Sequence, residues 1–430
     1  MASSWASKQL GDLAELHKEQ LDPRDSPDKL FQHFSIPAFD SSHAPAIEFG
    51  RSIQSQKFVV PANAILFSKL NPRIPRVWEP TVSSELSAIA STEFLVLVPR
   101  DGVDRRYLKY VCLAPSVLSN MKERVGGTSA SHQRVRPQDV LSIQVDVPDS
   151  LAEQKAIGHI LGTLDDKIEL NHRMNETLES MARTLFRSWF ADFDPVHAKA
   201  EGRSSGLSAA VDALFPSSFQ ESELGHVPDG WSSATLAELV RLNSETWSRA
   251  TYPEVVNYVD LSNAKWGHLE SIVSYEKADA PSRAQRVLRR GDSIVGMVRP
   301  GNGSYALVAD DGLTGSTGFA VLRPHKKTYR DFVYLAATNP ENIDRLAHLA
   351  DGGAYPAVLP NTVIATHIVC PSDAVMSSFS RLVAPMLDRV AACDRESRTL
   401  ASIRDTLLPK LLSGELRVKE AKHFTQERAL

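Results

Sequence analysis

The sequence predicts a mixed α/β protein made of two copies of one module, in which a globule is followed by a long helix. Five segments of the first half recur in the same order in the second half, shifted by about 225 residues, as in a duplicated structural unit. Short β-branched runs broken by Pro, Gly, Asn and Asp predict strands and turns. Two long segments have apolar residues at alternating spacings of four and three, which indicates coiled-coil pairing.

The first copy is expected to have its globule at 1–149 and its helix at 150–195. Runs such as KFVVP, AILFSKL and FLVLVP predict its strands, and 105–114 reads as a helix. Ser150 and Glu153 form a capping-box signature directly after Pro148, so the long helix is expected to begin there.

The second copy follows a Ser-, Gly- and Pro-rich connector at 196–224, in which we expect one short helix. Its globule is expected at 225–371, its long helix at 372–418 and a tail at 419–430. Pro385 lies inside this helix and is expected to kink it or to delay its start.

The heptad pattern extends over more than four repeats in each long segment, and each pattern contains a polar position, Asn175 and Ser397. Polar residues at such positions tend to fix register and partner. The alternative is that each helix packs only on its own globule. The positions that we expect to serve in the coiled coil or in subunit docking are Ile157, Leu161, Leu164, Ile168, Asn175, Leu178, Leu185, Trp189, Phe190, Val390, Leu400, Leu407 and Leu411.

Composition limits the class of protein. No apolar run reaches the roughly 20 residues that a membrane span needs, and the N-terminal segment lacks the pattern of a secretory signal. The three cysteines are far apart in the sequence and suggest neither a disulfide framework nor a zinc site, which fits a reducing cytoplasm. The net charge of -4 does not by itself indicate a nucleic-acid partner.

Sequence motifs for catalysis are absent. The chain has no G-x-x-x-x-G-K-[ST] phosphate loop, no Asn- or Asp-Pro-Pro-aromatic motif and no H-E-x-x-H pair. Taken together, these absences favour a binding subunit without a catalytic site, cofactor or metal of its own.

Three segments resemble a known family. Residues 150–196 resemble the central conserved region of type I restriction–modification specificity subunits, 407–416 resembles their C-terminal signature, and 225–231 resembles the start of their second target-recognition domain. The stretch LFRSWFADFDP is more specific than any heptad pattern.

The resemblance implies a sequence-specific, non-enzymatic DNA-binding subunit in phage defence. Each globule would read one half of a bipartite, asymmetric target, and the two helices would pair antiparallel. Two methyltransferase subunits would dock on the chain, and restriction subunits would complete the complex. S-adenosylmethionine, ATP and Mg²⁺ are expected on those partner subunits.

Base readout requires Arg, Lys, Asn, Gln, Ser or Thr on a surface that reaches the major groove. Two polar loops in each globule contain such residues, although ordinary solvated loops have the same composition. Arg286 and Arg290 belong to a basic cluster at 283–290 that suits phosphate contacts better. The remaining candidates are Lys69, Asn71, Arg73, Arg76, Ser129, His132, Gln133, Arg134, Arg136, Arg299, Asn302, Tyr305 and Tyr355.

Some alternatives stay open. Trp189 and Phe190 could dock a methyltransferase subunit, or they could bury against the second helix or the connector. A fused single-chain methyltransferase would need a cofactor domain for which the chain has no room. A coiled-coil scaffold that does not bind DNA and a complex that lacks the nuclease are further possibilities. The target sequence and its spacer cannot be read from one chain.

Overall fold

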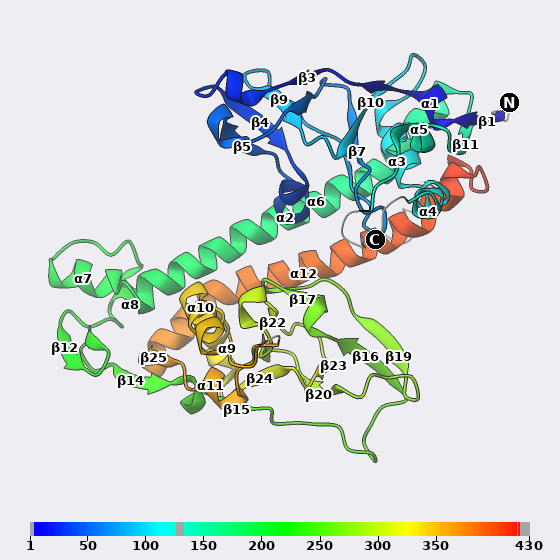
Figure 1. Cartoon of the computed structure of the whole chain (residues 1–430). Coiled ribbons are helices and arrows are strands. Elements are labelled where there is room, and N and C mark those ends of the chain that lie inside the picture. Colours follow the sequence, from blue (N-terminus) through cyan, green and yellow to red (C-terminus); the bar gives the residue numbers. More distant parts are fainter. Residues whose placement is uncertain (1–3, 126–132, 354, 419, 422–430) are drawn as a thin grey trace. The chain divides into compact units, whose positions relative to one another are not determined.

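The computed structural model describes residues 4–125, 133–353, 355–418 and 420–421 (Figure 1). It divides into two compact units. Unit 1 comprises Met1–Ile168 and Thr399–Leu430, and unit 2 comprises Glu169–Arg398. Both divisions fall inside long helices, so each unit contains one globule together with parts of both helices.

Unit 1 contains two sheets and a two-stranded ladder. The five-stranded sheet has the order β3 (Gln20–Leu21), β6 (Lys57–Val59), β9 (Ser87–Ala90), β4 (Leu30–Phe34), β5 (Ala46–Phe49). The four-stranded sheet has the order β2 (Ala14–His17), β10 (Phe94–Pro99), β7 (Ile65–Ser68), β8 (Val77–Trp78). Strand β1 (Trp5–Gln9) pairs antiparallel with β11 (Gln144–Pro148). The helices are α1 (Leu10–Leu13), α2 (Ile36–Ser42), α3 (Arg105–Leu113), α4 (Pro115–Glu123) and α5 (Pro137–Leu141), with 3-10 turns η1 (Pro23–Asp25) and η2 (Gly50–Ser52).

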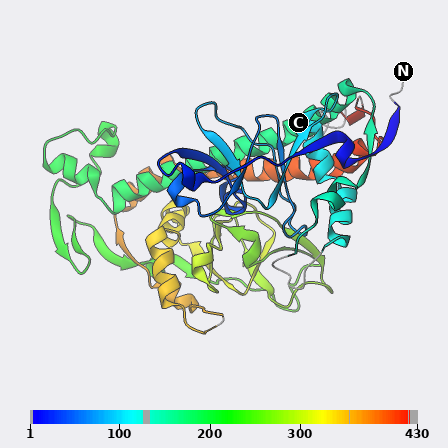
Figure 2. The same ribbon diagram turned by 45° about the horizontal axis from the view of Figure 1, so that its top comes forward.

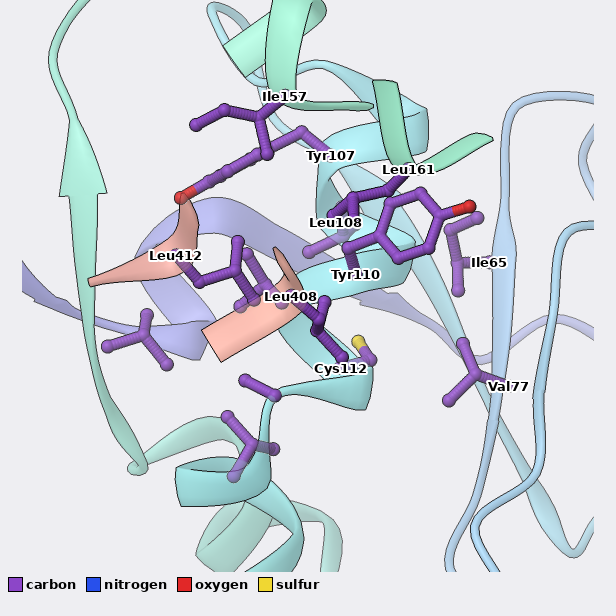
Figure 3. Close-up of a cluster of buried hydrophobic side chains, with 14 of the residues drawn as sticks. Ile65, Val77, Tyr107, Leu108, Tyr110, Cys112, Ile157, Leu161, Leu408 and Leu412 are labelled. Carbon is purple, nitrogen blue, oxygen red and sulfur yellow. The ribbon is translucent and has the colours of Figure 1, made fainter. Parts of the chain in front are cut away.

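The core of unit 1 joins its globule to both long helices. Strand β7 is buried along its whole length, and its first three residues are apolar, as expected for a strand that is covered on both faces. Helix α3 starts where the Asp104 side chain accepts a hydrogen bond from the Tyr107 main-chain nitrogen at 2.9 Å. Figure 3 shows Tyr107 and Cys112 of α3 among Ile157 of α6 and Leu408 of α12. Burial raises the pKa of the Cys112 thiol, as expected for an inert packing residue.

Unit 2 repeats this arrangement. One four-stranded sheet has the order β15 (Val240–Leu242), β24 (Phe319–Pro324), β21 (Ser293–Gly296), β22 (Tyr305–Leu307), and the other has β19 (Val273–Glu276), β16 (Val255–Val259), β23 (Leu313–Ser316), β20 (Ala284–Leu288). Two-stranded pairs are β14 (Ser232–Thr235) with β25 (His367–Cys370), β17 (Ala264–Lys265) with β18 (His268–Leu269), and β12 (Phe219–Ser222) with β13 (Gly225–Pro228). The helices are α7 (Asp194–Ala200), α8 (Ala209–Asp212), α9 (Arg330–Ala337), α10 (Pro340–Leu349) and α11 (Pro360–Ile364), with 3-10 turns η3 (Leu236–Glu238), η4 (Leu261–Asn263), η5 (Pro300–Asn302) and η6 (Lys327–Tyr329).

The strand pairings reproduce the duplication. The order β2-β10-β7-β8 corresponds to β15-β24-β21-β22, and the parallel pair β4–β9 corresponds to the parallel pair β16–β23. The ladder β1–β11 leads into one long helix, and the ladder β14–β25 leads into the other. The internal sequence repeat therefore marks two copies of one mixed α/β fold.

The long helices are α6 (Leu151–Phe190) and α12 (Asp373–Leu412), which lie side by side in both views (Figures 1 and 2). In unit 1 the start of α6 packs with the end of α12, and in unit 2 the end of α6 packs with the start of α12. The helices are therefore antiparallel, and the predicted fold class is confirmed. The expected heptad positions are buried or half-buried in both helices.

Local details differ from two expectations. Helix α12 begins at Asp373 and continues through Pro385, whose side chain is exposed, so the proline does not delay its start. The connector contains two short helices, α7 and α8, and the first strand of the β12–β13 hairpin instead of one short helix. At the start of α6 the Ser150 hydroxyl accepts a weak hydrogen bond from the Glu153 main-chain nitrogen at 3.4 Å, in the expected capping geometry.

Candidate nucleic-acid interface

Two polar segments of unit 1 that are far apart in sequence meet at a main-chain junction, which we call corner 1 and define as 69–73 with 133–136. The Asn71 nitrogen donates to the Gln133 carbonyl oxygen at 2.8 Å, and the Val135 nitrogen donates to the Lys69 carbonyl oxygen at 3.1 Å. Leu70 and Arg134 form an antiparallel bridge between these bonds. The fold thus joins the two loops that sequence analysis proposed separately.

Asn71 adopts a left-handed backbone with φ of 46° and precedes Pro72. Asparagine tolerates this conformation better than most residues with a side chain. Its side-chain oxygen is buried and has no hydrogen-bond partner among the described residues. These features suit a residue that shapes corner 1 more than one that reaches a base.

Unit 2 contains the same junction, which we call corner 2 and define as 297–303 with 355–358. The Arg299 nitrogen donates to the Pro356 carbonyl oxygen at 2.8 Å, and the Val358 nitrogen donates to the Met297 carbonyl oxygen at 3.0 Å. Val298 and Ala357 form the antiparallel bridge. Arg299 has φ of 47° and precedes Pro300, so both the hydrogen bonds and the unusual backbone of corner 1 recur.

The side chains of corner 2 include a stacked cation. The Arg299 guanidinium carbon lies 5.3 Å from the centre of the Tyr355 ring, within the range of a cation–π contact. Tyr355 is 73% exposed, and Asn302 on the same turn is exposed as well. Corner 2 therefore presents an arginine, an amide and an aromatic face to solvent, a combination that suits contact with nucleic acid.

The basic side chains of corner 1 have different surroundings from Arg299 in corner 2. Arg134 forms a two-nitrogen contact with the Glu93 carboxylate, with nitrogen–oxygen distances of 2.8 to 3.1 Å. The hydrogen bond from Arg134 lowers the pKa of Glu93. Arg73 and Arg136 are exposed, and Lys69 and Gln133 are half-buried. The exposed arginines remain the candidates for DNA contact at this corner.

Two predicted DNA-contact residues need correction. Arg76 is 7% exposed and forms a two-nitrogen ion pair with Asp40 at 2.6 and 2.8 Å, so it stabilises the loop instead of facing solvent. Tyr305 is 5% exposed and lies beneath Trp266 with ring centres 6.0 Å apart. The candidates Ser129 and His132 lie outside the described residues.

The basic cluster at 283–290 is partly neutralised. Arg289 pairs with Glu245 at 2.8 Å, and Arg290 lies 3.9 Å from Asp388. Arg286 is half-buried, and this burial lowers its pKa. Arg290 is exposed and remains the best candidate for a phosphate contact in this cluster.

Trp189 and Phe190 are buried in unit 2, which answers the question that the sequence left open. Trp189 is 1% exposed, and its ring centre lies 4.9 Å from that of Phe215 and 5.6 Å from that of Phe379. Phe190 contacts Phe379 and Phe332 at 4.9 Å each. Both side chains pack on the second helix, the connector and the globule, so neither is a docking residue on the surface.

Sequence analysis missed Trp266. This tryptophan is 56% exposed, has φ of 48°, and its nitrogen donates to the Gly303 carbonyl oxygen at 2.7 Å. A side chain on Gly303 would clash with the indole ring, since an added Cβ would lie 2.4 Å from it. The sequence feature that could have indicated this position is the pair Trp266-Gly267, which lies between the short strands β17 and β18.

Other kinds of site receive no support from the described part of the chain. No group of three or more His, Cys, Asp or Glu residues there could hold a metal ion. The described residues also include no helix that is long and apolar enough to cross a membrane.

Comparisons with known proteins agree on one family. A family model described as a type I restriction modification DNA specificity domain matches residues 2–180. The type I restriction enzyme HindI specificity subunit of Haemophilus influenzae is 24% identical over 470 residues, covering 96% of this chain and 100% of that protein. The MjaIX specificity subunit of Methanocaldococcus jannaschii is 25% identical over 339 residues, covering 76% of this chain and 72% of that protein. The crystal structure of a type I restriction–modification S subunit from M. genitalium has the same fold, with a TM-score of 0.57 at 16% identity, covering 95% and 96% of the two chains.

Proposed function

We propose that the chain is a specificity subunit of a type I restriction–modification system, which determines DNA sequence specificity without catalysis of its own, and that it reads a bipartite, asymmetric target. Each unit would contact one half-site through its corner. The observation that carries the proposal is the repeated junction, in which Asn71 and Gln133 correspond to Arg299 and Pro356.

The two half-sites would differ in sequence. The corners share their main-chain hydrogen bonds but not their side chains, since Lys69, Asn71 and Gln133 are replaced by Met297, Arg299 and Pro356. Specificity comes from side-chain contacts to base edges, whereas a shared backbone sets only the position of those contacts. An asymmetric target follows from this difference.

The helices α6 and α12 would act as the spacer. Both continue without a break across the division between the units, which supports a stiff connection. Duplicated readers on one face of a duplex are expected to have half-sites about one helical turn, ~34 Å, apart. Exposed apolar side chains on these helices, among them Leu170, Met181 and Leu382, would help to dock the methyltransferase subunits.

Partner subunits would supply the chemistry. We propose that two methyltransferase subunits bind S-adenosylmethionine and that restriction subunits bind ATP and Mg²⁺, with the present chain binding none of these. Purified alone, the chain should transfer no labelled methyl groups to DNA. Methylation by the isolated chain would contradict this assignment.

The experiment that tests the proposal is an exchange of one globule. Residues 1–149 are replaced by the matching globule of a relative, the chimera is co-expressed with its methyltransferase subunit, and methylated adenines are mapped genome-wide. One half-site should change while the other stays as in the wild type. If both half-sites change together, or no bipartite motif exists, the two-reader assignment is wrong.

A further inference from the structure

We propose that Trp266 reads a thymine in the half-site of unit 2, through an apolar contact between its indole ring and the 5-methyl group of the base. This inference rests on the proposed function and deepens it by naming one base and the group on it that is recognised. Trp266 is the first residue of the two-residue loop that joins β17 to β18, and Gly267 is the second.

The loop has a backbone that does not suit tryptophan. Both of its residues have positive φ, 48° at Trp266 and 102° at Gly267. Hairpin loops of this length with two positive φ values prefer Asn-Gly, because a bulky side chain is strained in this conformation. The shape of the hairpin therefore does not require tryptophan, and strain of this kind is concentrated at functional sites.

The base of the hairpin is anchored to α12 within unit 2. His268 Nδ1 lies 3.0 Å from Asp394 Oδ2. Arg398 donates a hydrogen bond to the Leu269 carbonyl oxygen at 2.9 Å. The strand that follows the loop is thus held by two side chains of a long helix, which restricts movement of the loop itself.

The tip of the hairpin is anchored to corner 2 and to β22. The main-chain nitrogen of Trp266 donates to the Gly303 carbonyl oxygen at 2.7 Å, and that of Gly267 donates to the Tyr305 carbonyl oxygen at 3.0 Å. The indole ring lies against Gly303 and meets the Tyr305 ring at 88°, yet 56% of the tryptophan remains exposed. The ring is therefore positioned before a ligand binds, which reduces the entropy lost on binding.

The hairpin is also a place where the two globules differ. The strand pairs β4–β5 and β16–β19 correspond, but α2 connects the first pair, whereas η4 and the β17–β18 hairpin connect the second. Each connection lies against the corner loop of its own unit. Asp40 of α2 pairs with Arg76 just after corner 1, and Trp266 covers Gly303 in corner 2. An element that differs between the copies beside their shared junction is well placed to give the half-sites different sequences.

Thymine is the base that matches an exposed apolar ring. In the major groove the base pairs present hydrogen-bond donors and acceptors, and the 5-methyl group of thymine is the apolar group among them. Trp266 covers the residue that follows Asn302, whose exposed amide suits polar contacts in the same groove. A partner protein could also cover the ring, but that contact would not depend on a methyl group of the DNA.

The test uses the full chain co-purified with its methyltransferase subunit, and duplexes that carry the mapped target. The half-site of unit 2 is the one that the exchange of residues 1–149 leaves unchanged. In this half-site each thymine is replaced in turn by deoxyuridine, which keeps base pairing and removes only the 5-methyl group. For the wild type we expect one replacement to weaken binding by about threefold to tenfold, as for the loss of one buried methyl contact.

The variants separate recognition from folding. Trp266→Asn and Trp266→Gly remove the ring and suit the left-handed backbone, so melting temperatures should show that both fold. Each should bind the thymine and deoxyuridine duplexes equally well. Trp266→Phe keeps an apolar ring and should retain most of the difference. Val255→Ala is the matched control, because Val255 is an apolar residue of the same unit that is 52% exposed, and it should show the wild-type difference.

The possible outcomes are distinct. A wild type that is insensitive to every replacement, or ring-free variants that keep the difference, overturns the inference and leaves the two-reader function intact. Weaker binding of the methyltransferase subunit by these variants, with the difference retained, would assign the ring to a protein interface instead. A loss in Trp266→Phe as complete as in Trp266→Asn would assign the effect to the indole N–H group and overturn the apolar contact. A wild-type chain without any bipartite target would overturn the proposed function itself.

Discussion

The main-chain nitrogen of Asn71 donates a hydrogen bond to the carbonyl oxygen of Gln133 at 2.8 Å, and this bond joins two loops of the first globule. The bond between the Arg299 nitrogen and the Pro356 carbonyl oxygen in the second globule has the same length, and a corresponding antiparallel bridge follows it. The two copies therefore share the main-chain hydrogen bonds of this junction, whereas their side chains differ.

The stability of corner 1 should depend on the left-handed backbone conformation of Asn71. We expect Asn71→Ala to lower the free energy of unfolding by about 1–2 kcal/mol, because alanine is strained in this conformation. Asn71→Gly is the control and should cost less, since glycine adopts positive φ freely. Chemical denaturation of the purified chain measures both. Equal losses for alanine and glycine would show that the backbone is not the cause.

A half-buried carboxylate, Asp165, should stabilise the contact between globule and helices in unit 1. Asp165 accepts hydrogen bonds from Lys109 at 2.8 Å, Tyr110 at 2.6 Å and Arg404 at 2.8 Å. Asp165→Ala removes this acceptor from Lys109 and Tyr110, while Arg404 keeps its contact with Asp405, and we expect a loss of about 3–5 kcal/mol in unfolding free energy.

The adjacent residue Asp166 provides the matched control for that experiment. Its side chain is 62% exposed and pairs with Arg106, so Asp166→Ala should cost less than about 1 kcal/mol. Denaturant midpoints of the two variants give the comparison. Similar small losses for both would contradict the role of Asp165.

Trp189 should be essential for the stability of the free chain. Removing its ring from the aromatic cluster is expected to cost about 3–5 kcal/mol. Met181→Ala on the exposed surface of the same helix is the control and should leave the melting temperature nearly unchanged. If Trp189→Ala folded normally and only lost its partner subunits, the residue would be a docking contact and the assignment to the core would be wrong.

Unit 2 should lose stability as pH rises. His268 Nδ1 lies 3.0 Å from Asp394 Oδ2, and His268 Nε2 lies 3.5 Å from Glu179 Oε1. Burial alone would lower the pKa of His268, but the hydrogen bond and charge of Asp394, with the charges of Glu179 and Glu270, raise it overall. Burial raises the pKa of Glu179, although the charges of His268 and Arg183 act in the opposite direction.

Stability should fall with rising pH because the pKa values of His268 and Glu179 are both higher in the folded chain, so the folded state binds more protons than the unfolded state. The contribution of Glu179 is complete below its ordinary value of 4.5 and is lost above it, and that of His268 is complete below 6.5 and is lost as pH rises through its raised pKa. We expect the urea midpoint to fall as pH rises above 4.5 and to go on falling as pH rises above 6.5. The His268→Gln variant should flatten the upper part of this profile, and a parallel profile would contradict the role of His268.

The helices were predictable because their signal is local. Ile157, Leu161 and Leu164 repeat within a few residues of one another, and this periodicity alone indicates a buried helix face. For the sheets, the sequence predicted individual strands but not the order in which they pair. The parallel pairing of β4 with β9 joins Phe31 to Ser87, and no local pattern specifies such a distant partner.

The candidate site was predictable in place but not in every residue. The segments around Asn71 and Arg299 were identified because polar loops with Pro and Gly stand out between apolar strands. Arg76 was misassigned because the sequence around a loop arginine does not show whether its side chain faces solvent or an ion-pair partner. Its partner Asp40 lies in α2, 36 residues earlier in the chain. Tyr305 was misassigned because it lies on the three-residue strand β22, and the side-chain pattern of so short a strand does not show which face other residues cover.

The most direct test of the central claim, two readers held apart by two helices, is a matched insertion. Four residues are added to α6 between Ile168 and Glu169 and four to α12 between Arg398 and Thr399, so that contacts within each unit are kept. Four residues lengthen each helix by about 6 Å and add slightly more than one turn of about 3.6 residues. Two control variants carry either the same insertion in the connector at 201–208 or a two-residue insertion, which disrupts the heptad phase.

Mapping methylated adenines in cells that express the variant with its methyltransferase subunit gives the measurement. The account predicts that both half-sites keep their sequences while the unread gap grows by about one or two base pairs, since one base pair rises ~3.4 Å. The connector insertion should leave the gap unchanged, and the two-residue insertion should lower activity. A fully active matched variant with an unchanged gap would contradict the claim that the helices set the distance between the half-sites.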